Sequence, residues 1–129
     1  MHIGTVYKQG KSANKTISER LLVLYPREIM WYHDKKEMEK GLPPLGVIFI
    51  SDIYKTSETL MQAKTFDFDI SFVKYIRKGE TVEKPNHINF GCKSAAQRHE
   101  WISMIEFLRA NTIYEEYVNK YVNIQFPLR

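Results

Sequence analysis

The strongest constraint on the fold of this chain is an alternation of apolar and polar residues between positions 66 and 72. The apolar positions are Phe66, Phe68, Ile70 and Phe72, and the polar ones are Asp67, Asp69 and Ser71. This pattern is typical of an antiparallel strand with one buried face and one wet face. We therefore expect the apolar row in the core. Asp67 and Asp69 are expected on a solvated face rather than as an acid/base pair.

Six further segments have strand character. They span residues 3–8, 17–25, 29–33, 46–50, 53–57 and 87–92. The turn at Pro26-Arg27-Glu28 is so short that the strands on either side should pair as a hairpin. The polar stretches 11–16, 34–44 and 77–86 are predicted to be loops.

The hydrophobic period changes after Cys92. Ser94-Ala95-Ala96-Gln97 is a capping box, in which two side chains satisfy amides that the start of a helix leaves free. Trp101, Ile105 and Leu108 then follow at helical spacing, which predicts an amphipathic helix. We expect this helix to end at Asn111 and a second short helix to run from Thr112 through Tyr121.

Length and composition indicate one globular domain. The chain has 129 residues, of which 43% are hydrophobic and 26% charged. No run approaches the roughly 18 apolar residues of a membrane span, and the first 20 residues lack the apolar core of a signal peptide. The single cysteine, Cys92, cannot form an internal disulfide, which favours a reducing compartment.

The positive charge is concentrated at the start of the chain. Residues 1–27 carry five basic side chains and one acid, Glu19, whereas residues 28–129 carry 14 of each. A local excess of this kind attracts phosphate groups on lipids, nucleic acids or proteins. The alternative is that a net charge of +4 only keeps the protein soluble.

Little in the sequence supports catalysis. The four histidines show no metal-ligand spacing, none pairs with Cys92 in a known signature, and no glycine-rich phosphate loop or nucleophile elbow is present. Cys92 lies in an apolar strand and is interpreted as a small core residue. We expect a binding module rather than an enzyme, with no cofactor and no metal site.

The order of these segments resembles a pleckstrin homology (PH) domain over roughly residues 3–110. Matching motifs occur in the family's order, at Gly4–Gly10, Arg20–Leu24, Ile29–Tyr32, Gly46–Ile50, Phe90–Cys92 and Glu100-Trp101. The resemblance implies a partly open barrel of seven antiparallel strands in two nearly orthogonal sheets, capped by one amphipathic helix. It divides the chain into a PH domain at residues 1–110 and a helical extension at 111–129. The extension is expected to pack on or beside the barrel.

The resemblance also implies a lipid-binding site. In lipid-binding members of the family, a lysine that ends the first strand and a basic-x-Arg motif in the second grip inositol phosphates. Lys8 and Arg20 match the outer positions, but Ser18 occupies the middle basic position. Tyr32 matches a third-strand tyrosine that bonds phosphate in some members. Lys11 and Lys15 could supply the missing charge.

This incomplete motif favours a simple anionic headgroup, such as phosphatidic acid, or loose affinity for several phosphoinositides. Membrane residence would then need a second anchor, because four basic residues supply only about 4 kcal/mol. The expected place is the cytosolic face of a membrane. The alternative is a protein-docking domain of the same fold without useful lipid affinity.

A narrower resemblance is to the apicomplexan acylated PH-domain proteins, which sense phosphatidic acid on secretory organelles. It rests on the richness in Lys, Ile, Tyr and Asn. Their acylation sites lie upstream of the domain. This chain begins Met1-His2 and carries no myristoylation signal itself, so the expected anchor would lie upstream.

The sequence also bears on protein and nucleic-acid partners. A protein partner could bind the segment 112–129, where Tyr114, Tyr117 and Tyr121 share one helical face, although that face is expected to pack back on the barrel. No nucleic-acid partner is expected. The basic cluster is small and lacks interleaved aromatic residues.

Overall fold

The structure is a computed structural model that describes residues 1–9, 16–59 and 65–122. Its elements in chain order are β1 (His2–Gln9), β2 (Ile17–Leu24), β3 (Glu28–Tyr32), α1 (Lys35–Glu39), β4 (Gly46–Phe49), η1 (Ile50–Asp52), β5 (Ile53–Thr59), β6 (Phe66–Phe72), β7 (Tyr75–Arg77), β8 (Glu80–Val82), β9 (Asn86–Cys92), α2 (Ala95–Tyr117) and η2 (Val118–Val122). The expected class, mostly β with a C-terminal helix, is confirmed.

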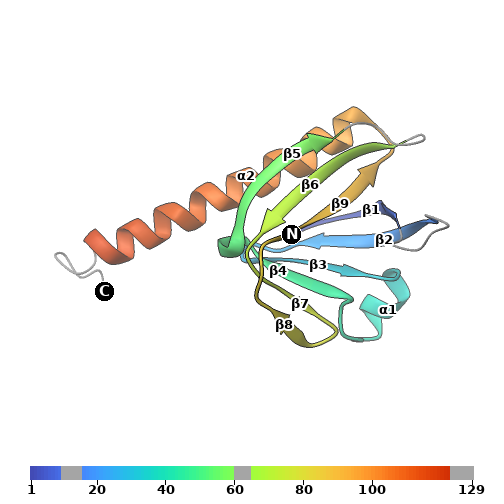
Figure 1. Cartoon of the computed structure of the whole chain (residues 1–129), viewed down its shortest axis with the longest axis horizontal. Helices are drawn as coiled ribbons and strands as arrows, with labels where there is room; N and C mark the ends of the chain where they lie inside the picture. Colours follow the sequence, from blue (N-terminus) through green and yellow to red (C-terminus); the bar gives the residue numbers. More distant parts are fainter. Residues whose placement is uncertain (10–15, 60–64, 123–129) are drawn as a thin grey trace.

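The strands form a curled, antiparallel half-barrel (Figure 1). Their order across the sheet is β5-β6-β9-β1-β2-β3-β4-β7-β8. The strand count differs from the expected seven, because the described residues form nine strands, all joined by hydrogen bonds into one continuous sheet. At the β1–β9 junction only Tyr7 and Gly91 are paired, so the sheet bends there into two parts that remain connected.

Two short strands were not expected. The predicted loop 77–86 contains part of the β7–β8 hairpin, in which Arg77 pairs with Glu80 across a two-residue turn. Both turn residues, Lys78 (φ 51°) and Gly79 (φ 82°), have the positive φ that a type I′ turn requires. The predicted loop 34–44 likewise contains α1, which Asp34 caps by accepting a hydrogen bond from the Glu37 amide at 2.9 Å.

The core confirms most of the predicted burial. Phe68, Ile70 and Phe72 are buried in the barrel with Val6, Leu22 and Ile48, and Phe66 is half-buried at its edge. Asp67 corrects the expectation of a solvated face, because it is only 6% exposed and accepts a hydrogen bond from Thr65 at 2.7 Å. Gly91 lies opposite it and makes room, since a Cβ there would come within 2.8 Å of the Asp67 carboxylate.

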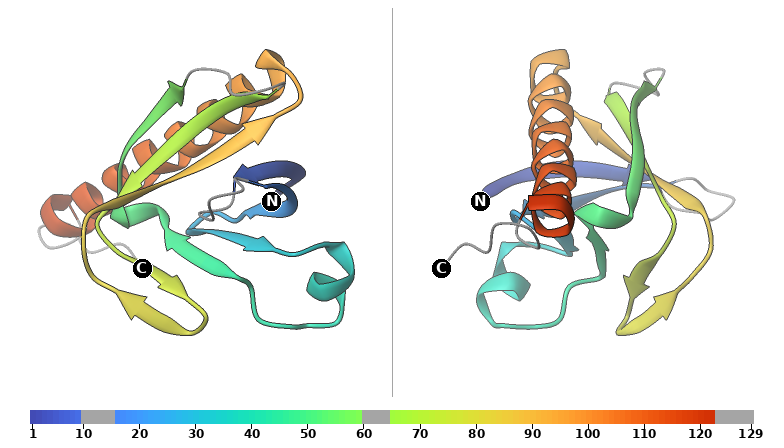
Figure 2. Two further views of the ribbon diagram at one scale, coloured as in Figure 1. Left: turned by 45° about the vertical axis from the view of Figure 1, so that its right-hand side comes forward. Right: turned by 90° about the vertical axis from the view of Figure 1, so that its left-hand side faces the viewer.

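Helix α2 runs along the curled sheet beside β5 and β6, and its C-terminal part projects past the sheet (Figures 1 and 2). Its start confirms the capping box, since Ser94 Oγ accepts from the Gln97 amide at 3.1 Å and Gln97 Oε1 accepts from the Lys93 amide at 3.1 Å. Trp101 and Ile105 are buried, and the Trp101 ring covers Gly4, where a Cβ would lie 3.0 Å from Cζ2.

The predicted helix end at Asn111 is wrong. Helix α2 continues to Tyr117 without a break, and the Thr112 hydroxyl donates to the Leu108 carbonyl at 2.9 Å instead of capping a new helix. Residues Val118–Val122 continue as a π-helical turn. The expectation that Tyr114, Tyr117 and Tyr121 pack back on the barrel is also wrong, because all three are more than half exposed.

Candidate functional site

The open end of the barrel holds a pocket of about 430 Å³, within the size range of small-molecule sites. Its described lining comes from strands and turns at this end: Lys8, Arg20, Trp31, His33, Leu45, Phe72, Tyr75, Arg77, Lys78, Asn86, His87 and Ile88. The floor is apolar and the rim is basic. Among the described residues that line it, none carries a carboxylate, so the site favours an anion.

Two neighbouring strands place the first pair of cations. In the β1–β2 register Lys8 lies opposite Ser18 and Val6 opposite Arg20, so alternation turns Lys8 and Arg20 to the inner face of the barrel. Both are half-buried. Glu19 points to the other face. One Arg20 nitrogen, Nη1, donates to the Glu19 backbone carbonyl at 2.8 Å, so the contact uses the main chain and leaves the guanidinium charge without a carboxylate at this position.

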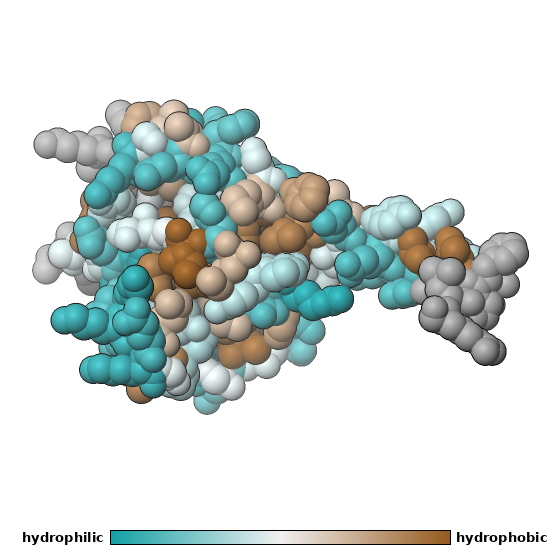
Figure 3. Space-filling model, turned by 180° about the vertical axis from the view of Figure 1, so that it is seen from behind, coloured by the Kyte–Doolittle hydropathy of each residue, from teal (hydrophilic) through white to brown (hydrophobic). Residues whose placement is uncertain are grey.

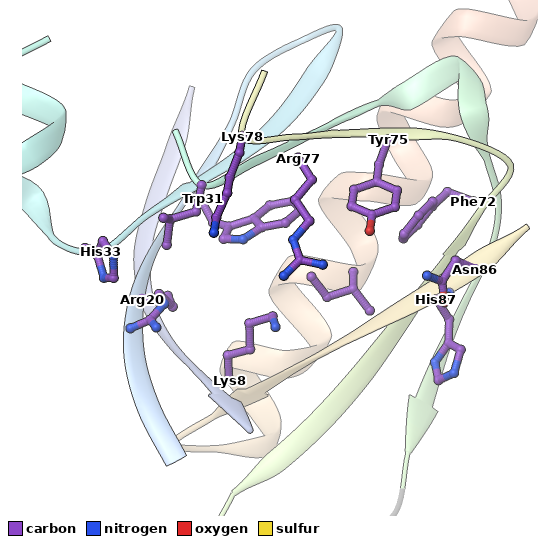
Figure 4. A pocket seen from close by; sticks show the side chains of 12 residues that line it. Lys8, Arg20, Trp31, His33, Phe72, Tyr75, Arg77, Lys78, Asn86 and His87 are labelled. Atoms are coloured by element: carbon purple, nitrogen blue, oxygen red, sulfur yellow. Dashed lines mark hydrogen bonds between the residues drawn. The ribbon is translucent and has the colours of Figure 1, made fainter. Parts of the chain in front are cut away.

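The β7–β8 hairpin supplies the second pair of cations. Arg77 ends β7 next to Gly46 of β4, and Lys78 stands at the tip of the tight turn. In Figure 4, Lys8 and Arg77 reach into the cavity from opposite sides, with Arg20 and Lys78 at its edge. Sequence reasoning missed Arg77 and Lys78 as site residues. The only hint in the sequence is Gly79, because glycine readily supplies the positive φ that a two-residue hairpin turn needs.

Aromatic side chains shape the floor of the pocket. Trp31 is buried and meets Phe90 edge-on, with ring centroids 5.7 Å apart. Phe72 and Tyr75 make a similar contact at 5.1 Å. These rigid contacts hold the floor in place, so a bound group would meet a preformed surface.

The structure brings together only part of the residues predicted from the sequence. Lys8 and Arg20 line the same pocket, whereas Lys11 and Lys15 lie outside the described residues. Tyr32 is not brought to the pocket. It is buried on the other face of the sheet with Leu21 and Val23, and its hydroxyl lies 3.6 Å from the Met30 sulfur. This burial raises the pKa of Tyr32, and the nearby Tyr25 raises it by a smaller amount.

The remaining candidate residues behave as core or surface groups. Cys92 is buried, as expected. Its burial, and to a smaller extent the negative charge of Asp67, raises the pKa of its thiol to about 11. Over the described ranges, no three metal-ligating side chains cluster. No helix in the described part of the chain is long and apolar enough to cross a bilayer.

Comparison with known proteins decides the family. The PH domain family model matches residues 1–109. The chain belongs to the PH domain family. PH domains are typically binding modules rather than enzymes. No curated protein sequence matches the chain.

Solved structures give the same fold. A structure of the Slm1 PH domain, from a structural study that demonstrates ligand binding in the non-canonical site of that domain, aligns with a TM-score of 0.60 at 15% identity and covers 84% of this chain and 96% of that one. A second, the Slm1 PH domain in complex with inositol-4-phosphate, aligns with a TM-score of 0.59 at 16% identity over 84% of this chain and 95% of the other. At these identities the likeness establishes the PH fold of the chain alone.

Proposed function

We propose that this PH domain binds the phosphorylated headgroup of an anionic membrane lipid at the open end of its barrel. The observation that carries the proposal is the convergence of Lys8, Arg20, Arg77 and Lys78 on one pocket with an apolar floor. Lysine and arginine give charge-assisted hydrogen bonds to phosphate oxygens, and arginine can bind two at once. Inositol-4-phosphate binding by a PH domain of the same fold supports the choice of ligand class.

The charge of the site sets the expected strength. Each basic residue near an anionic surface contributes about 1 kcal/mol, so four give about 4 kcal/mol, which is a millimolar contact. Stable membrane residence therefore needs a second anchor. We propose an acyl chain as one such anchor, by analogy with the apicomplexan acylated PH-domain proteins. The protein would then sit peripherally on the cytosolic face of a membrane.

The arrangement of the cations bears on headgroup choice. Ser18 occupies the middle position of the basic motif, directly opposite Lys8, so the described strands β1 and β2 present two cations of the motif instead of three. Arg77 and Lys78 add charge from the far side of the pocket. We propose that this spread favours a single accessible phosphate, as in phosphatidic acid, or several phosphoinositides bound loosely. Lys11 and Lys15 are proposed to add attraction at the same rim.

Vesicle co-sedimentation tests the proposal. Vesicles of neutral lipid with increasing phosphatidic acid, or with a phosphoinositide, should pellet the protein increasingly, and salt should weaken the effect. Lys8→Ala/Arg20→Ala should weaken binding about 30-fold and Arg77→Ala about 5-fold, from about 1 kcal/mol per charge. The matched control is Lys55→Ala, which removes an exposed lysine on β5 away from the pocket and should change little. Equal pelleting with neutral vesicles would contradict the proposal.

A further inference from the structure

Helix α2 carries a second apolar face that the barrel does not cover. Phe107, Tyr114 and Tyr117 are 65%, 68% and 57% exposed, and Ala110 is exposed between them. Tyr121 in the following turn is 52% exposed and contacts the Tyr117 ring at a tilt of 44°, with ring centroids 5.1 Å apart. We call these five residues the aromatic stripe. Large exposed apolar faces of this kind mark interaction sites.

The aromatic stripe faces away from the barrel. Successive residues of a helix are about 100° apart, so Phe107, Ala110 and Tyr114 lie roughly half a turn from the buried Trp101 and Ile105. Within α2, positions 107, 110, 114 and 117 follow the a/d spacing of a heptad, and Tyr121 in the π-helical turn extends the row through its ring contact with Tyr117. That spacing is the seam along which two helices pack.

An apolar groove continues the aromatic stripe onto the barrel. It has a volume of about 280 Å³, and its lining includes Met104, Phe107 and Leu108 of α2 and Tyr25 and Pro26 of the β2–β3 turn. Apolar surface gathers where the projecting helix meets the body of the molecule (Figure 3). Phe107 therefore belongs to both features, and the two form one surface.

We propose that two copies of this chain pair antiparallel through the aromatic stripe, with the last helical turns of each copy seated in the groove of the other. A seam of only about two heptads is too short to pair alone, so the groove has to add area to it. The same surface serves both copies, so the pair has two-fold symmetry and closes on itself.

Side-chain size favours the antiparallel register. Antiparallel helices set a positions against d positions, which places small Ala110 opposite large Tyr114 of the other copy and Phe107 opposite Tyr117. A parallel pair would set Ala110 against Ala110 and leave a void there. Glu106 adds no contact across the seam, because its carboxylate accepts from Thr56 and Arg109 of its own chain. Ile113, which is 63% exposed, meets its own symmetry mate.

The pairing is independent of lipid binding, because no residue of the aromatic stripe lines the basic pocket. It has a consequence for the proposed function, however. A pair carries two basic pockets, and two weak contacts with one membrane bind together far more tightly than either does alone.

The first test is sedimentation velocity of the 129-residue chain. Because a small interface gives weak pairing, it is run from about 5 to 500 µM. A monomer–dimer equilibrium is expected. Tyr114→Glu places a charge in the seam and should raise the dissociation constant of the dimer at least 10-fold. The matched control is Tyr54→Glu, which changes an exposed tyrosine on β5 and should leave the equilibrium as it is. Circular dichroism checks that both variants remain folded.

Cross-linking tests the register. Asn111 meets its own symmetry mate in the antiparallel pair, so Asn111→Cys should form a disulfide-linked dimer under mild oxidation, whereas Ala110→Cys should do so only in a parallel pair. The native Cys92 is 1% exposed and does not compete. Monomer at every concentration, a dimer that survives Tyr114→Glu, or cross-linking of Ala110→Cys alone would each overturn the proposal. If the protein stays monomeric and the Tyr114→Glu variant loses vesicle binding, the aromatic stripe binds a membrane and the pairing proposal is wrong.

Discussion

Gly46 is the position where a single methyl group should couple the core to the binding pocket. It pairs with Trp31 across β3 and β4, and the indole ring crosses directly over it. A Cβ at this position would lie 2.0 Å from Trp31 Cζ2 and 2.4 Å from Cη2. Both distances are far inside van der Waals contact, so Gly46→Ala requires Trp31 to move.

The expected cost follows from how tightly Trp31 is held. The ring is 5% exposed and packs edge-on against Phe90, so it has little room to shift. Overpacking of this kind costs about 1–3 kcal/mol. Replacing glycine in a strand returns about 0.5–1 kcal/mol, because the unfolded chain loses freedom. We therefore expect Gly46→Ala to lower the free energy of unfolding by about 1–2 kcal/mol.

Urea denaturation followed by tryptophan fluorescence measures this change. Gly4→Ala is the graded control, because its Cβ would lie 3.0 Å from Trp101 Cζ2 and needs a much smaller adjustment. A Trp31→Leu/Gly46→Ala cycle should show a coupling of at least about 1 kcal/mol, since removal of the indole removes the clash. Because Trp31 also lines the pocket, Gly46→Ala should weaken headgroup binding as well. An unchanged stability with zero coupling would refute the reasoning.

Three further predictions concern the core and the helix. Burial raises the pKa of the Cys92 thiol to about 11 from an ordinary 9.0, so the thiol of the unfolded chain ionises at lower pH than that of the folded protein. The free energy of unfolding should therefore fall as pH rises from 9 towards 11, with no contribution from Cys92 below pH 9. Cys92→Ala should remove this fall from the pH profile of urea unfolding. Asp67→Ala should lower the free energy of unfolding in urea by about 1–3 kcal/mol, because the buried Asp67 carboxylate no longer accepts from the half-buried Thr65 hydroxyl; Asp67→Asn, which keeps an acceptor, should lower it less. Thr112→Pro should break α2 where the helix runs on past Asn111 and lower the helical circular dichroism signal, while an unchanged signal would show that the helix already ends there.

The fold was predictable where a pattern was long enough to read. The seven-residue alternation around Phe68 has four apolar positions and the stripe of Trp101, Ile105 and Leu108 has three, so both the strand and the helix could be recognised. The three-residue strands β7 and β8 are too short to show alternation, and the sequence hints at their turn only through Gly79. Asp67 looked solvated because alternation gives the side of a strand, not what covers that side.

The site was predictable only along the β1–β2 hairpin. Lys8 and Arg20 lie on adjacent strands whose register follows from local pattern, so their convergence could be inferred from the sequence. Arg77 joins them from more than 50 residues away, through pairing of β7 with β4. Such long-range pairing leaves no local signal. Tyr32 matched a family position by sequence, yet strand alternation turns it to the outer face with Leu21.

The central claim is that the open barrel end holds the headgroup. The most direct test is a titration of the isotope-labelled protein with inositol-4-phosphate and, separately, glycerol phosphate, each to about 10 mM, followed by amide chemical shifts in NMR. We predict saturable shifts gathered at Lys8, Arg20 and the Arg77-Lys78 turn, together with the Trp31 indole, and their loss in Lys8→Ala/Arg20→Ala. Shifts that gather elsewhere in the fold, or that persist in this variant, would contradict the account.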